Sequence, residues 1–332
     1  MTRGRSVVVG ILVSVSAALT YQYVMLIDLP TVERRMAMHR LVVEGQAPSP
    51  YRYRVLVPQT TDVIVRALTS RFRDDQAFLL AYALYDFVAF SLLLFVLFWY
   101  LREWFSPVAA LLGVLFVACT MPVAFDDHYF QPWSWLEVAL FSLGLFALVR
   151  KRDGMFAALV LLASLNRETG LWLALAHPLT RWSFDELKHA PRSSRLRAAI
   201  SSIAMLAIWA GIFLGLRQVL GSAPHVNTLA QAWASNTTGR NLLRTGLRIV
   251  VLFGAFGVFA VAGFRHAPDF VRRTVRLVPF WLALVLPYGL WWEVRLLVPL
   301  YPIVVPLALA FVFPRDLGLG PATHEPPPKP TP

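Results

Sequence analysis

Long apolar segments recur along the whole chain, and they constrain the fold more than any other feature of the sequence. Of the 332 residues, 57% are hydrophobic and only 15% are charged, whereas a soluble globular protein has about 25% charged residues. A water-soluble domain of this size cannot bury that excess, which excludes a soluble enzyme and a disordered chain. Eight segments are candidate membrane spans: Ser6–Ile27, Ala77–Leu101, Pro107–Ala124, Pro132–Val149, Ala198–Leu220, Leu247–Phe264, Val278–Trp291 and Leu296–Phe313.

A ninth apolar segment, Gly154–Thr180, carries Asn166, Arg167 and Glu168 at its middle. Each half has about 11–12 residues, roughly 17 Å of helix, which is too short to cross ~30 Å of hydrocarbon. Basic residues flank both ends, as expected of segments that face the cytoplasm. We therefore expect a hairpin of two half-length helices rather than one span with a charged centre.

The fold class predicted is all-α: a polytopic integral membrane protein with about eight full spans and one half-helix hairpin. Residues 1–313 form a single transmembrane domain, in which residues 28–76 make a long first extracytoplasmic loop with amphipathic helices. Residues 314–332, rich in proline, are predicted to be a disordered cytoplasmic tail. Basic residues gather on one side of the predicted spans, which puts both termini in the cytoplasm. Nearly all of the basic residues are Arg, which is typical of GC-rich bacterial genomes, so we expect a bacterial inner membrane.

The formal charge of +12 does not indicate nucleic-acid binding, because the basic residues lie between apolar segments. This topology places charged and polar side chains together on the outer face. Arginine forks bind phosphate and a carboxylate can accept a hydroxyl proton, so the group is suited to a phosphorylated lipid and a polar partner. Its members are Asp28, Arg52, Arg54, Asp126, Asp127, His128, Asn166, Arg167, Glu168, Glu293 and Arg295.

Each part of this group also has a simpler interpretation. Asp28 could end a helix in water, and Arg52 and Arg54, which point the same way in an extended chain, could reach lipid headgroups. Asp126 and Asp127 are candidate ligands of a divalent cation, although a hydrogen-bonded turn explains them as well. Ionisable residues at membrane depth are costly, so Arg167 and Glu168 are expected to be paired with each other or with the outer loops.

The sequence resembles the GT-C class of polytopic glycosyltransferases, which take sugars from polyprenyl-phosphate carriers. The resemblance rests on Asp28 after the first span, the long first loop, Asp126-Asp127 after the third span, the half-helices, and the late element from Glu293-Val294-Arg295-Leu296 to Pro302. The acidic pair usual in the first loop of this class is reduced here to Asp28 with Glu33.

The resemblance implies inverting transfer of a sugar from a polyprenyl-phosphate donor to a lipid or glycan acceptor on the extracytoplasmic face. Asp28 would be the general base, while Arg52, Arg54, Arg167 or Arg295 would stabilise the departing phosphate. Asp127 and Glu168 would be catalytic residues beside Asp28 and, with Asp126, would orient sugar hydroxyls or those arginines. His128, Asn166 and Glu293 would bind substrate. Two other functions fit the same sequence: a non-enzymatic membrane assembly partner, and a transporter of lipid or solute.

Overall fold

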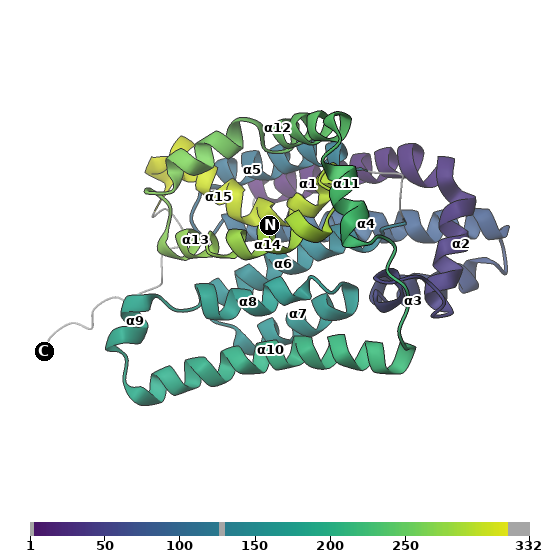
Figure 1. The fold of residues 1–332 in the computed structure, drawn as a ribbon. Helices are drawn as coiled ribbons and strands as arrows, with labels where there is room; N and C mark the ends of the chain where they lie inside the picture. The colour runs from purple at the N-terminus through teal and green to yellow at the C-terminus, as the bar shows by residue number, and fades with distance from the viewer. Residues whose placement is uncertain (1–2, 126–129, 318–332) are drawn as a thin grey trace, which may run out of the picture.

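The computed structural model describes residues 3–125 and 130–317, and every regular element within those ranges is helical (Figure 1). The helices are α1 (Arg3–Tyr23), α2 (Val32–Val43), α3 (Leu56–Leu68), α4 (Asp74–Leu101), α5 (Pro107–Thr120), α6 (Trp133–Val149), α7 (Asp153–Asn166), α8 (Gly170–Thr180), α9 (Phe184–His189), α10 (Arg192–Leu220), α11 (Leu229–Asn236), α12 (Gly239–Gly263), α13 (Asp269–Thr274), α14 (Leu277–Tyr288) and α15 (Tyr301–Val312).

Within the described residues, six helical segments are long and apolar enough to cross a membrane, fewer than the eight full spans expected. The segment expected at Pro132–Val149 forms α6, a helix of 17 residues. The segment expected at Val278–Trp291 forms α14, which has 12 residues and ends at Tyr288, next to Pro287 and Gly289. Both are shorter than every one of the six segments. The six are Gly4–Val43, Asp74–Leu101, Pro107–Ala124, Arg192–Leu220, Gly239–Gly263 and Val294–Val312.

The apolar segment with the charged centre forms two helices, α7 and α8, of 14 and 11 residues. Arg181, which follows α8, forms an ion pair of 3.2 Å with Asp153 at the start of α7, so the two outer ends of this hairpin lie together. The turn between the helices is tight, because a Cβ at Gly170 would lie 2.7 Å from the backbone nitrogen of Ser164. Glycine is the residue that allows this close approach of one backbone to another.

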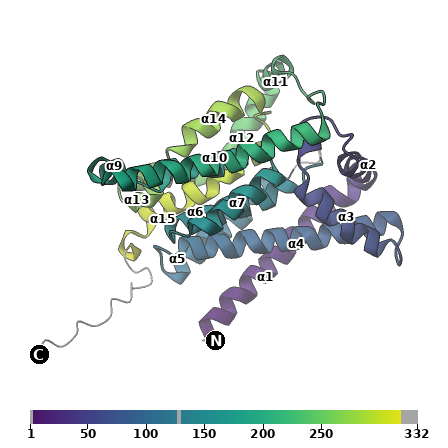
Figure 2. The ribbon, with the colours of Figure 1, turned by 90° about the horizontal axis from the view of Figure 1, so that it is seen from below.

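The hairpin lies in the middle of the molecule, between α6 on one side and the long helix α10 on the other (Figure 1). At one end of the helices lie α2, α3 and α11, together with the turn of the hairpin, and we call this end the site face (Figure 2). At the opposite end lie α9 and α13. The site face therefore receives the polar residues that follow α1, α7 and α14 in the chain.

The apolar surface that remains outside the core covers much of α10 and α12. Side chains such as Ile203, Leu214, Val250, Val258 and Val261 are between 62% and 81% exposed. Contiguous apolar surface of this extent is unstable in water and suits contact with lipid chains. The helical fold and its apolar exterior are those of a multi-pass membrane protein.

Candidate functional site

A cavity of about 310 Å³ lies at the site face, where the hairpin turn approaches α10 and α14. Its lining combines charged side chains of the first loop, the hairpin turn and α10 with apolar side chains of α14. The lining residues include Tyr51, Arg54, Arg167, Glu168, Arg217, His225, Leu284, Tyr288 and Glu293.

Arg54 and Glu168 form an ion pair at the edge of the cavity. Nε of Arg54 donates to Oε2 of Glu168 at 3.0 Å, and a second guanidinium nitrogen donates to the other carboxylate oxygen. The Arg54 guanidinium also lies over the ring of Trp133, 4.9 Å from its centre, and the residue is 3% exposed. Arg54 is thus held among protein groups and does not extend to lipid headgroups.

Glu168 lies in the connection between α7 and α8, outside the candidate spans. Burial raises the pKa of this carboxyl, but the attraction of Arg54 and the hydrogen bonds from it outweigh burial. The pKa of Glu168 is therefore held below its ordinary value, and the carboxylate is ionised at neutral pH. Its side chain is 27% exposed, so it is accessible from the cavity.

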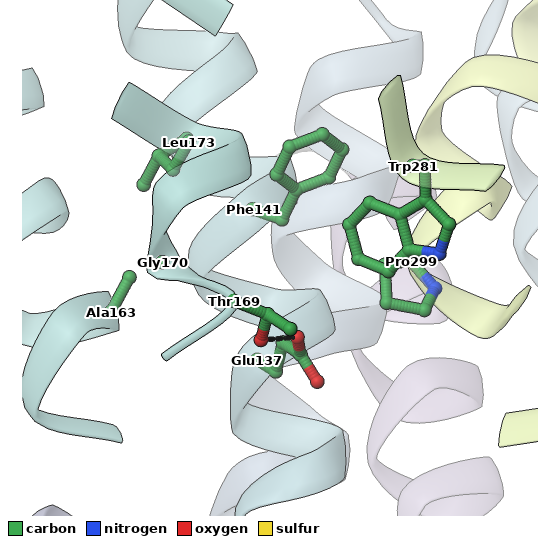
Figure 3. Close-up of a pocket in the computed structure, with 8 residues that line it drawn as sticks. All are labelled: Glu137, Phe141, Ala163, Thr169, Gly170, Leu173, Trp281 and Pro299. Atoms are coloured by element: carbon green, nitrogen blue, oxygen red, sulfur yellow. Dashed lines mark hydrogen bonds between the residues drawn. The ribbon is translucent and has the colours of Figure 1, made fainter. Parts of the chain in front are cut away.

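Arg167, the neighbour of Glu168, turns the opposite way and pairs with Glu137 of α6. Nη1 of Arg167 lies 2.6 Å from Oε2 of Glu137, and both side chains are at least 90% buried. The hydroxyl of Thr169 donates to the other oxygen of Glu137 (Figure 3). The same view shows Trp281 and Pro299, which line a small space together with Glu137 and Thr169. The volume of this space is about 10 Å³, enough for one water molecule. The Arg167–Glu137 pair is therefore closely packed.

Glu293 and Arg295 form a third buried pair, in which the guanidinium donates to Glu293 and the two side chains are 7% and 3% exposed. Glu293 lines the cavity. The segment before this pair is held by Asn236 at the end of α11, whose amide nitrogen donates to the Gly289 carbonyl at 2.8 Å. The amide oxygen of Asn236 accepts from the backbone of Trp291, also at 2.8 Å.

Arg52 has a different position from the one expected. Tyr51–Tyr53 forms a turn of 3₁₀ helix, not an extended strand, so Arg52 and Arg54 do not point the same way. Arg52 donates to the carbonyls of Ala47, Leu220 and Ser222 at 3.0–3.2 Å. These bonds fasten the first loop to the end of α10, and Arg52 does not line the cavity.

Asp28 is 0% exposed and lies beside Arg35, whose Nη2 is 2.8 Å from its carboxylate. The Arg35 guanidinium carbon lies 5.6 Å from the centre of the Tyr23 ring and 5.3 Å from the centre of the Phe130 ring. A second fully buried carboxylate, Asp86 of α4, also interacts with Arg35. Asp28 therefore belongs to a buried cluster that does not line the cavity, and its role as a base stays a prediction.

The remaining predicted residues divide into two groups. Asn166 is 1% exposed and its amide donates to the Trp133 carbonyl at 3.1 Å, so it fixes the hairpin to α6 without lining the cavity. Asp126, Asp127 and His128, and the divalent-cation site considered there, lie outside the described residues. Within the described ranges, no group of three His, Cys, Asp or Glu side chains could hold a metal ion.

Arg35 and Arg217 take part in these polar contacts but are not among the site residues predicted from the sequence. Arg35 follows Asp28 by seven residues, but the pair forms because the chain turns at Leu29–Thr31 between them, so the spacing alone gave no signal. Arg217 is the single charged residue in the last turns of the apolar segment that ends at Leu220, and a charge at that depth is a signal of a polar site.

Comparison of this chain with protein-family models, with curated proteins and with solved structures found no match.

Proposed function

We propose that this chain is a membrane glycosyltransferase that takes a sugar from a polyprenyl-phosphate carrier. The observation that supports this most directly is the composition of the cavity at the site face. Its lining contains three arginines, Arg54, Arg167 and Arg217, together with Leu284 and Tyr288 of α14, which are themselves 41% and 65% exposed. An amphiphile with an anionic head and a long apolar chain matches both kinds of side chain, because the apolar chain can lie along α14.

The proposed orientation places the site face outside the cytoplasm of a bacterial inner membrane. The opposite end carries the basic segments Arg150–Arg152, Arg192–Arg197 and Arg272–Arg276, which the positive-inside rule assigns to the cytoplasm. Nucleotide sugars are cytoplasmic, so an outward-facing transferase requires a donor attached to a lipid. The acceptor is then a lipid or glycan hydroxyl on the outer side.

In the proposed reaction, the acceptor oxygen forms a bond to the anomeric carbon as the bond from that carbon to the phosphate oxygen breaks. The arginines stabilise the negative charge that the departing polyprenyl phosphate gains. A carboxylate accepts the proton of the acceptor hydroxyl. Of the predicted catalytic carboxylates, Glu168 lines the cavity in the described part of the chain, whereas Asp28 acts as the base only if the side chains that bury it move.

The test is transfer by purified protein in nanodiscs, given polyprenyl-phosphate sugars and candidate acceptors. Loss of the base is expected to lower turnover by about 10²–10⁴-fold. Glu168→Gln is compared with Asp28→Asn and with the control Glu103→Gln, which removes a carboxylate paired with Arg150 away from the cavity. A loss in Glu168→Gln alone assigns the base to Glu168, and a loss in Asp28→Asn alone assigns it to Asp28.

Absence of turnover in the wild-type protein with a full panel of donors would overturn the enzymatic proposal. It would leave the chain as an assembly partner or a transporter. If both carboxylate variants kept full turnover, neither residue would be the base.

A further inference from the structure

Four exposed cations gather where α9 leads into α10, at the end of the molecule opposite the site face (Figure 2). Lys188, Arg192, Arg195 and Arg197 lie within ten residues of chain that include no acidic residue, and all four side chains are exposed. None of the four forms an ion pair with a described side chain. Clusters of basic residues directly beside a membrane-spanning helix are typical of sites that bind anionic lipid headgroups.

The described carboxylates of the neighbouring helices α7, α9 and α13 are engaged with groups outside α10. Asp153 pairs with Arg181, and Asp269 pairs with the arginine three residues after it. The carboxylate of Glu186 accepts a hydrogen bond from the backbone nitrogen of Ser183 at 2.6 Å. The cations at the start of α10 are therefore open to an anion from outside the chain.

The face of α10 that follows these cations is apolar and exposed. The helix runs along the outside of the molecule and packs on α7 and α8, with Ala198 and Met205 as its buried residues (Figure 1). Leu196 and Ile203 lie on the opposite face of the helix, and each is more than half exposed. Arg192 comes four residues before Leu196, so it lies one turn away on this same face.

The spacing of these residues matches the shape of a phospholipid. From Arg192 to Ile203 the helix rises about 16 Å, close to half of the ~30 Å hydrocarbon core of a bilayer. A headgroup at Arg192 thus leaves its acyl chain beside Leu196 and Ile203. Arg192 and Arg195 are neighbours on the helix surface, where two like charges repel each other, and a phosphate that accepts hydrogen bonds from both guanidinium groups removes this repulsion.

We infer that the start of α10 binds a phospholipid with an anionic headgroup, whose phosphate lies between Arg192 and Arg195 and whose acyl chain lies along Leu196 and Ile203. A zwitterionic phospholipid offers the same acyl chains, but the cation in its headgroup cancels the charge of its phosphate. The arginines therefore favour the anionic lipid. This site lies away from the cavity, and the inference does not depend on the proposed function.

The test measures the binding of individual lipid molecules to the full chain, purified in detergent, by native mass spectrometry. The probes are dioleoyl phosphatidylglycerol and dioleoyl phosphatidylcholine, which share their acyl chains and differ in the charge of the headgroup. The ratio of the two Kd values therefore reports on the headgroup alone. We expect phosphatidylglycerol to bind the wild type about 10-fold more tightly, and Arg192→Gln/Arg195→Gln should bring the two Kd values close together.

A second double variant separates a defined site from the general positive charge of this end of the molecule. Lys151→Gln/Arg152→Gln is the matched control, because it removes two exposed cations from the connection between α6 and α7. It should keep the wild-type preference for phosphatidylglycerol. The single variant Arg192→Gln should lose part of the preference, and it provides the comparison if the double variant of α10 does not fold.

Three results would overturn the inference: equal Kd values for the two lipids in the wild type, an unchanged preference in the α10 variants, or an equal loss of preference in Lys151→Gln/Arg152→Gln. The headgroup without acyl chains, glycerophosphoglycerol, is added as a competitor. It should displace phosphatidylglycerol only at concentrations far above that of the lipid. Displacement at an equal concentration would assign the arginines to a soluble phosphate ester and would also overturn the inference, because the apolar face of α10 would then contribute nothing.

Discussion

Replacement of Arg167 by Leu should destabilise the fold far more than replacement of an arginine in an exposed ion pair. Arg167 is 7% exposed and Glu137 is 10% exposed, so the variant leaves the Glu137 carboxylate buried without its cation. Removal of one partner from a buried pair costs about 3–5 kcal/mol. Because the hydroxyl of Thr169 still donates to Glu137, we expect the lower end of this range, about 3 kcal/mol.

The assay is reversible unfolding of the purified protein in mixed micelles, with the free energy of unfolding measured against the mole fraction of sodium dodecyl sulfate. The control is Arg272→Leu, which removes an ion pair with Asp269 whose side chains are 42% and 71% exposed. Such a pair contributes about 0–1 kcal/mol. The double variant Arg167→Leu/Glu137→Leu should recover most of the loss, since it removes both charges together.

The reasoning is refuted if Arg167→Leu lowers the free energy of unfolding no more than Arg272→Leu does. It is also refuted if the double variant is less stable than Arg167→Leu, because the loss would then come from packing and not from a stranded carboxylate.

Three other perturbations test the structure around the site. Gly170→Ala should open the hairpin turn, because the added Cβ would meet the backbone of residues 163 and 164. The variant should therefore unfold at a lower temperature than the control Gly154→Ala, whose Cβ would enter open space. In a Cys119→Ser background, Arg152→Cys and Arg181→Cys should react with a membrane-impermeant maleimide from the same side, since Asp153 and Arg181 are paired; labelling from opposite sides would exclude the hairpin. Arg52→Ala should speed amide hydrogen exchange of the 3₁₀ turn at 51–53, because three hydrogen bonds that hold the first loop are lost. Unchanged exchange would show that Arg52 does not fasten the first loop to α10.

The apolar segments and the hairpin could be predicted from sequence because each depends on residues that are close in the chain. The length of an apolar run and the charge at its ends are local properties. The partner of Arg167 could not be predicted, since Glu137 lies 30 residues earlier on another helix, and nothing in the sequence favours it over Glu168.

The burial of Asp28 could not be predicted from the sequence either. After Asp28 the chain turns at Leu29–Thr31 into α2, which brings Arg35 back against the carboxylate. The side chains of Arg52 and Arg54 were predicted to point the same way, as alternate residues of an extended strand do. The segment instead adopts a helical turn stabilised by contacts with α10. Local patterns thus predict that charged groups gather at one end of the helices, but tertiary contacts determine which of the described ones line the cavity.

The hydrogen bonds between Arg52 and the end of α10 also set an order in which the protein can assemble. The donor and its acceptor at Leu220 are separated by 168 residues of chain. At a synthesis rate of about 5–20 residues per second, the first loop leaves the ribosome roughly 8–34 seconds before its partner exists. The cavity therefore cannot form helix by helix during insertion, and a nascent chain that stops before α10 has the arginines of the first loop without the wall that positions them.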